Sequence, residues 1–175
     1  MKRTNRWMRW ASAVLLCMMP GALVAQSSGE AWRMATQAEL AQTLPARAPV
    51  LRERIETEMR TASGVTDGKG KYIAGVVLIT AGYSADGKYS HYFQSQVPLK
   101  IGNFSLRPGR YVIGWTHMQN GLGVSFYEAV TGRWIGTADA TREKSSRVDA
   151  FRMTPPGANP RIYIGRFSFA YSVGN

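Results

Sequence analysis

From Tyr72 onward, short runs rich in β-branched and aromatic residues alternate with dipeptides that favour turns. The runs cover residues 72–83, 89–97, 99–105, 110–117, 122–129, 132–138, 147–153 and 161–173. The turn signals are Asp86-Gly87, Pro108-Gly109, Asn120-Gly121, Thr131-Gly132 and Pro155-Pro156-Gly157. Such spacing is typical of all-β domains. We therefore predict a mainly β fold, an antiparallel β-sandwich or small barrel of about eight strands.

Alternation within the runs predicts which side chains face the core. Leu122, Val124 and Phe126 share one face of their run, because successive side chains of a strand point to opposite sides. Trp115 shares a face with Ile113 and is therefore predicted to be buried.

The last run changes phase in its middle. Ile162 and Ile164 are in one phase, whereas Phe167 and Phe169 are in the other. The change falls at 165–166, where a glycine would suit a β-bulge. We therefore predict one bulged strand that keeps its apolar side inward.

A short helix is predicted near the start of the region before Tyr72. Thr36 and Glu39 have the spacing of a capping box, which marks helix N-termini. Pro45 ends the helix, because proline disfavours helical geometry in the residue before it.

A second short helix is predicted after Pro49. Leu51, Ile55 and Met59 recur every four residues, which gives a narrow apolar stripe on a helix. The segment 64–71 is rich in glycine and charge and is interpreted as a linker.

The first 25 residues have the layout of a secretory signal peptide. Four basic residues, Lys2, Arg3, Arg6 and Arg9, precede a short apolar run. That run covers about ten residues, fewer than the roughly 20 of a spanning helix. We predict cleavage after Ala25 and a secreted or periplasmic protein that does not span the membrane. The predicted organisation is 1–25 signal peptide, 26–70 helical segment with linker, and 71–175 β-sandwich domain.

Charge and cysteine content narrow the function after this cleavage. The chain has 22 Lys and Arg, 11 Asp and Glu, and one Cys. Removal of 1–25 leaves 18 basic residues and no cysteine, so disulfides and thiol catalysis are excluded. Export and a basic net charge together indicate an anionic envelope polymer, a glycan or another envelope protein as partner, rather than nucleic acid. The oligomeric state is left open.

No residue set predicts catalysis, a metal site or a cofactor. The chain has two histidines, His91 and His117, without metal-ligand spacing, and no nucleophile-elbow motif. A small secreted hydrolase that uses these histidines with Glu128, by carboxylate or metal chemistry, remains the alternative to a noncatalytic binding protein. A further alternative is an eight-stranded outer-membrane barrel, suggested by the number of runs.

Aromatic rings on a sheet face and surface arginines are the candidate binding residues. Aromatic rings on a sheet can stack on sugars, and arginines attract anions. The candidates for ligand binding are Trp115, Tyr127, Trp134, Arg107, Arg110 and Arg133. The net basic segment 141–147 and Arg166 add to the basic surface.

The stretch from Phe104 to Ile113, FSLRPGRYVI, resembles the F-x-L-x-P-G-x-Y-x-V hairpin of transthyretin-like and carboxypeptidase-regulatory-like secreted β-sandwich modules. Residues 73–77 are similar to the opening strand of those modules. The sequence departs from that pattern after Ile113. The resemblance implies a noncatalytic binding or scaffold module and supplies no catalytic residues. In layout the whole chain is similar to secreted bacterial proteins.

Overall fold

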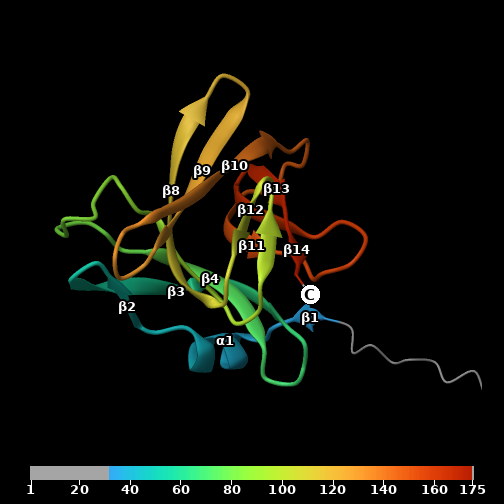
Figure 1. Cartoon of the computed structure of the whole chain (residues 1–175), viewed down its shortest axis with the longest axis horizontal. Coiled ribbons are helices and arrows are strands. Elements are labelled where there is room, and N and C mark those ends of the chain that lie inside the picture. The colour runs from blue at the N-terminus through green and yellow to red at the C-terminus, as the bar shows by residue number, and fades with distance from the viewer. Residues whose placement is uncertain (1–31, 175) are drawn as a thin grey trace, which may run out of the picture.

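The computed structural model describes residues 32–174, and the predicted signal peptide lies outside them (Figure 1). The mainly β prediction is confirmed. The elements are β1 (Arg33–Met34), α1 (Gln37–Thr43), β2 (Arg47–Val50), β3 (Glu53–Thr66), β4 (Tyr72–Leu78), β5 (His91–Ser95), β6 (Leu99–Ile101), β7 (Phe104–Leu106), β8 (Gly109–Met118), β9 (Gly121–Glu128), β10 (Trp134–Arg142), β11 (Asp149–Met153), β12 (Arg161–Gly165), β13 (Phe167–Ala170) and β14 (Ser172–Val173).

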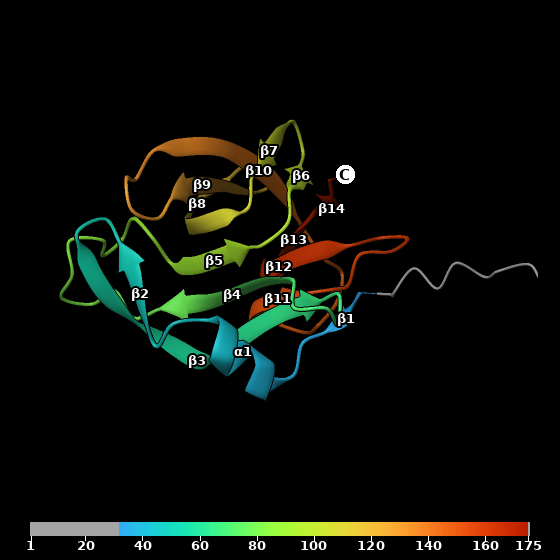
Figure 2. The same ribbon diagram turned by 60° about the horizontal axis from the view of Figure 1, so that its bottom comes forward.

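One antiparallel sheet forms most of the structure and curls into a nearly closed, barrel-like sandwich. Its strands follow the order β1-β3-β4-β5-β8-β9-β10-β13-β12-β11, and β2 pairs with β3 at its side. The strand at the far end of this order, β11, lies against β3 near the other end. The Met153 backbone N–H of β11 donates to Ser63 Oγ of β3 at 3.1 Å. A small separate sheet of β14, β6 and β7 packs on this sheet and contributes Leu99, Ile101 and Leu106 to a shared hydrophobic core (Figure 2).

Two hydrophobic cores lie on opposite sides of the curled sheet. The inner core is rich in aromatic rings, including Phe93, Phe126 and Phe169. The second core lies under α1 and the β2–β3 hairpin and contains Leu40 and Tyr92. Figure 2 shows α1 lying along β3 on that side. No helix among residues 32–174 has the length and hydrophobicity needed to cross a bilayer.

The first predicted helix is confirmed, and the second is wrong. In α1, the Glu39 backbone N–H donates to Thr36 Oγ1 at 3.3 Å, and the Thr36 N–H donates to Glu39 Oε2 at 2.8 Å, which completes the capping box. Residues expected in the second helix instead form β2, a turn and β3. The error has a simple physical reason: a spacing of four is also even, so Ile55 and Met59 share a strand face as readily as a helix face.

The glycine-rich linker is also shorter than predicted, because β3 continues through Thr66 and pairs with β4. Gly64 lies inside this pairing. A Cβ atom on it would approach the Ala74 Cβ to 2.7 Å, so glycine is required by close strand packing there. The described part of the segment 26–70, residues 32–70, therefore shares its sheet with the region after it.

The predicted bulge in the last run is wrong as well. Ile164 pairs with Phe167 across an antiparallel ladder, so β12 and β13 form a hairpin with a two-residue turn at 165–166. Gly165 has φ +62°, as the first turn position of a type II′ hairpin requires. The change of phase marks two strands, and it places Ile164 and Phe167 opposite each other.

Candidate ligand-binding cleft

The main candidate site is a cleft where β8 extends beyond its neighbour β5. β5 pairs with β8 only as far as His91 opposite Ile113. The rest of β8 continues beside β9 to the pair Met118 and Gly121. The loop 79–90 and the β12–β13 hairpin form the other walls. The space within this open cleft is about 630 Å³, within the range of small-molecule sites.

Three aromatic rings form one wall of this cleft. The Trp115 and His117 ring centroids are 5.3 Å apart with an 82° angle between planes. His117 lies edge-on to Phe167, with centroids 6.5 Å apart. The rest of the lining includes Val77, Leu122 and Ile164. The cleft is therefore largely apolar.

Trp115 is 41% exposed, so its predicted burial is wrong. The face assignment was sound, because Trp115 pairs with Val124 and both point to the inner side of the sheet. Val124 is buried, whereas Trp115 lies past the end of β5 and has no strand beyond it. The length of a neighbouring strand decides this exposure.

His91 forms a buried polar group at the base of the cleft, with 4% of its surface exposed. Its Nε2 lies 3.0 Å from the carbonyl oxygen of Ala150, which can only accept, so Nε2 carries the hydrogen. Its Nδ1 lies 2.8 Å from Ser90 Oγ. Burial lowers the pKa of His91 to about 4, and the hydrogen bond to Ala150 offsets this only in part. His91 is therefore neutral at pH 7.

Ser90, His91 and the Ala150 carbonyl have the connectivity of a nucleophile, a base and an orienting acceptor. Two features weaken this chemistry. The Ser90 hydroxyl also lies 3.2 Å from the Ile113 carbonyl oxygen, which competes for its hydrogen. The lowered pKa of His91 makes its ring a weak base.

In the structure, the side chains of Tyr127 and Trp134 do not lie beside Trp115. Tyr127 and Trp134 pair across β9 and β10 on the side of the sheet opposite Trp115. Tyr127 is half-buried and packs edge-on against Tyr89, with centroids 5.3 Å apart. Trp134 is 58% exposed, and its Nε1 donates to Thr137 Oγ1 at 3.3 Å. The three rings therefore form no common platform.

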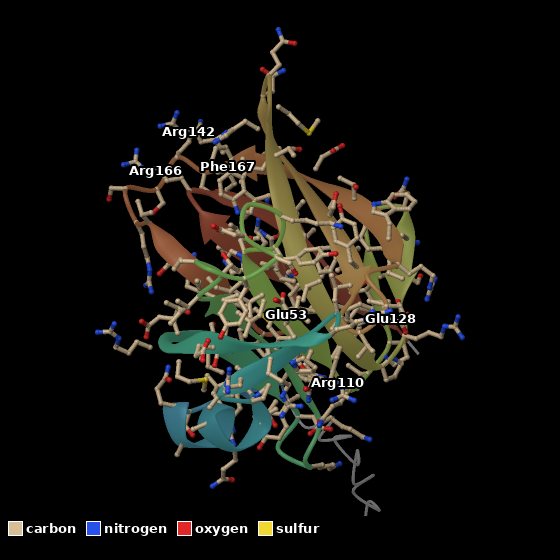
Figure 3. All side chains as sticks on the ribbon, turned by 90° about the vertical axis from the view of Figure 1, so that its left-hand side faces the viewer. Glu53, Arg110, Glu128, Arg142, Arg166 and Phe167 are labelled. Atoms are coloured by element: carbon tan, nitrogen blue, oxygen red, sulfur yellow. The ribbon has the colours of Figure 1, made fainter. Side chains whose placement is uncertain are left out.

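The three predicted arginines lie near the opposite end of β8 from the cleft. Arg107 precedes β8, and its carbonyl accepts the Tyr111 hydroxyl at 2.6 Å. Arg110 is the second residue of β8, and Arg133 Nε lies 3.7 Å from Glu128 Oε2. Figure 3 shows Phe167 in the upper part of the view and Arg110 and Glu128 below it, nearer the lower part of the molecule.

The alternative His–carboxylate set is only partly brought together. His91 and His117 both line the cleft. Glu128 pairs with Tyr111, six positions along β8 from His117, or roughly 20 Å at the rise of a strand. No group of three or more His, Cys, Asp or Glu side chains within residues 32–174 is placed to hold a metal ion.

Sequence reasoning missed Phe167 and Ile164 as site residues. The sequence signal for both residues is the change of phase at 165–166, and a bulge there places both side chains in one core strand. A Gly-X dipeptide between two alternating runs is also a hairpin signal, and that interpretation would have placed both residues at a strand end.

No family model, curated protein or solved structure matches this chain. The resemblance of residues 104–113 to transthyretin-like modules therefore stays a prediction.

Proposed function

We propose that this protein is an exported, noncatalytic binding protein whose cleft takes up the apolar part of an envelope component. The observation that carries the proposal is the cleft itself, about 630 Å³ with a wall of Trp115, His117 and Phe167. Export rests on the signal-like residues 1–25 and remains part of the proposal.

The physical basis is the apolar surface that the cleft leaves in contact with water. Trp115 is 41% exposed although it points to the inner side of the sheet. Burying such a ring against an apolar ligand stabilises the complex by about 25 cal/mol per Å² removed from water. The cleft is built on strands and a short hairpin, which favours a preformed site.

This geometry favours an apolar ligand over a stacked glycan. A sugar platform needs several exposed rings on one face, and Trp115 and Trp134 lie on opposite faces of the sheet. Among the aromatic rings of residues 32–174, Trp134 is the one left widely exposed on its side of the sheet, near Tyr127. The glycan and protein-partner hypotheses therefore receive less support than an apolar envelope component such as a lipid.

A neutral fluorescent probe, N-phenyl-1-naphthylamine, tests the proposal directly. We expect saturable binding with a rise in probe fluorescence. Trp115→Ala and Phe167→Ala should each weaken it about tenfold, because both rings form the cleft wall. Trp134→Ala is the matched control, since it removes an exposed tryptophan from the other face. Equal losses in the Trp134 and Trp115 variants, or no probe binding, would contradict the proposal.

A second candidate function, ester hydrolysis, is favoured by the hydrogen-bonded chain of Ser90, His91 and Ala150 inside the cleft. The measurement is nitrophenolate release from p-nitrophenyl acetate. Binding without chemistry predicts the same rate for the protein and its Ser90→Ala variant. Turnover by the unmodified protein that is lost in the Ser90→Ala variant would establish ester hydrolysis instead.

A further inference from the structure

We propose that the ligand of this cleft is an amphiphile whose anionic head group is held by Arg142 and Arg166 at the rim of the cleft beside Gly165 and Phe167, which we call its mouth. This inference rests on the proposed function, because it names the chemical class of the molecule that the cleft would bind. It differs from a general basic surface, since it assigns the head group to two particular guanidinium groups.

The first argument is position. Arg142 pairs directly with Phe167 across β10 and β13, so both side chains project from the same side of the sheet. Arg166 is the second residue of the β12–β13 turn, between Gly165 and Phe167, which both line the cleft. Figure 3 shows Arg142 and Arg166 beside Phe167.

The second argument is that both guanidinium groups are available. Arg142 and Arg166 are exposed, and neither takes part in an ion pair formed within residues 32–174. The neighbouring carboxylate, Glu143, is engaged elsewhere: it lies 3.2 Å from Arg161 Nε and accepts a hydrogen bond from the Ser168 hydroxyl. An anion at this mouth would therefore not have to displace a carboxylate of the chain from either arginine.

The third argument is the absence of opposing charge inside the cleft. None of the residues described as lining it is acidic, and Lys88 is the charged residue among them. In the loop 79–90, Asp86 accepts a hydrogen bond from Thr80 at 3.4 Å and does not itself line the cleft. His91 at the base is neutral at pH 7 and bonded within the protein.

These features together match an amphiphile in one orientation. The chain of the ligand would lie along Trp115, Leu122 and Ile164, away from water. Its carboxylate or phosphate would remain at the mouth, where arginine can form paired, charge-assisted hydrogen bonds without taking the anion deep into an apolar environment. Such exposed ion pairs weaken as salt rises.

Displacement of the naphthylamine probe tests this assignment, with the two anions kept below their critical micelle concentrations and the alcohol below its solubility limit. The ligands are dodecanoate, dodecyl phosphate and neutral 1-dodecanol. We expect both anions to displace the probe at lower concentrations than the alcohol does. The Arg142→Gln/Arg166→Gln double variant should bind both anions about tenfold more weakly and bind the alcohol with unchanged affinity. Arg110→Gln is the matched control, because Arg110 is also exposed and lies at the other end of β8.

The outcomes separate the two proposals. If the probe binds to the protein but the anions and the alcohol displace it equally well, the head-group assignment is overturned and the cleft is left as an apolar site. Equal weakening by Arg110→Gln would also overturn it, because general positive charge would then explain the preference. Failure of the probe to bind would remove the proposed function itself. Whichever anion binds more tightly identifies a fatty carboxylate or a phospholipid-like head group as the source.

Discussion

Replacement of Phe126 by alanine is expected to lower the free energy of unfolding by about 3–5 kcal/mol. Phe126 is fully buried in the inner core, and its ring contacts three others. The centroid distances are 5.7 Å to Phe93, 5.7 Å to Phe104 and 6.0 Å to Phe169. These rings come from β5, β7 and β13, so the variant leaves a cavity where several strands meet.

Urea unfolding of the purified variant measures this loss as a lower midpoint with an unchanged slope. Phe126→Leu keeps most of the volume and should lose much less. Phe104→Ala is the matched control, because Phe104 contacts Phe126 from a half-buried position in β7. A Phe126→Ala variant no less stable than Phe104→Ala would contradict the inner core as described.

The free energy of unfolding is expected to fall by about 3 kcal/mol as the pH is lowered from about 6.5 to about 4. The cause is His91, whose pKa burial lowers from 6.5 to about 4 in the folded protein. Between these values the unfolded chain binds a proton that the folded chain excludes. Stability contributed by neutral His91 is therefore complete above pH 6.5 and is lost on acidification.

The acidic side chains act in a lower pH range. The hydrogen bonds from Arg33 and Arg60 hold the pKa values of Glu39 and Glu58 at about 2, so their contributions are present above pH 4.5 and decrease only below it. The slope between pH 4.5 and 6.5 should therefore belong mainly to His91.

The measurement is the urea midpoint at half-unit pH steps. His91→Gln removes the titrating group and should flatten the curve between pH 4.5 and 6.5, whatever its stability at pH 7. His117→Gln is the control, since His117 is exposed at the cleft wall. An unchanged slope in His91→Gln would show that another group causes the acid sensitivity.

The β character of this protein and its first helix follow from local sequence. The alternation of Leu122, Val124 and Phe126 needs only the period of a strand, and all three side chains are buried as predicted. The Thr36–Glu39 capping box is likewise a local interaction across one helical turn. Such features can be predicted without knowing which distant segment packs against them.

Other features depend on pairing between distant segments, which single-sequence patterns do not report. The period-four stripe of Leu51, Ile55 and Met59 fits a helix or a strand equally. Pairing with β2 and β4 made the part from Glu53 onward a strand, and Leu51 lies in the turn before it. The dipeptide Gly165-Arg166 could serve a bulge or a turn, and the ladder between Ile164 and Phe167 made it a turn.

The cleft is the clearest case of tertiary determination. The sequence alone placed Trp115 on the inner face of its strand, and this was right. Its exposure follows from the end of β5 at His91, and Phe167 reaches the same cleft because β13 pairs with β10. Side-chain direction is set by neighbours in the chain, whereas burial and binding surfaces are set by which strands lie alongside and where they end.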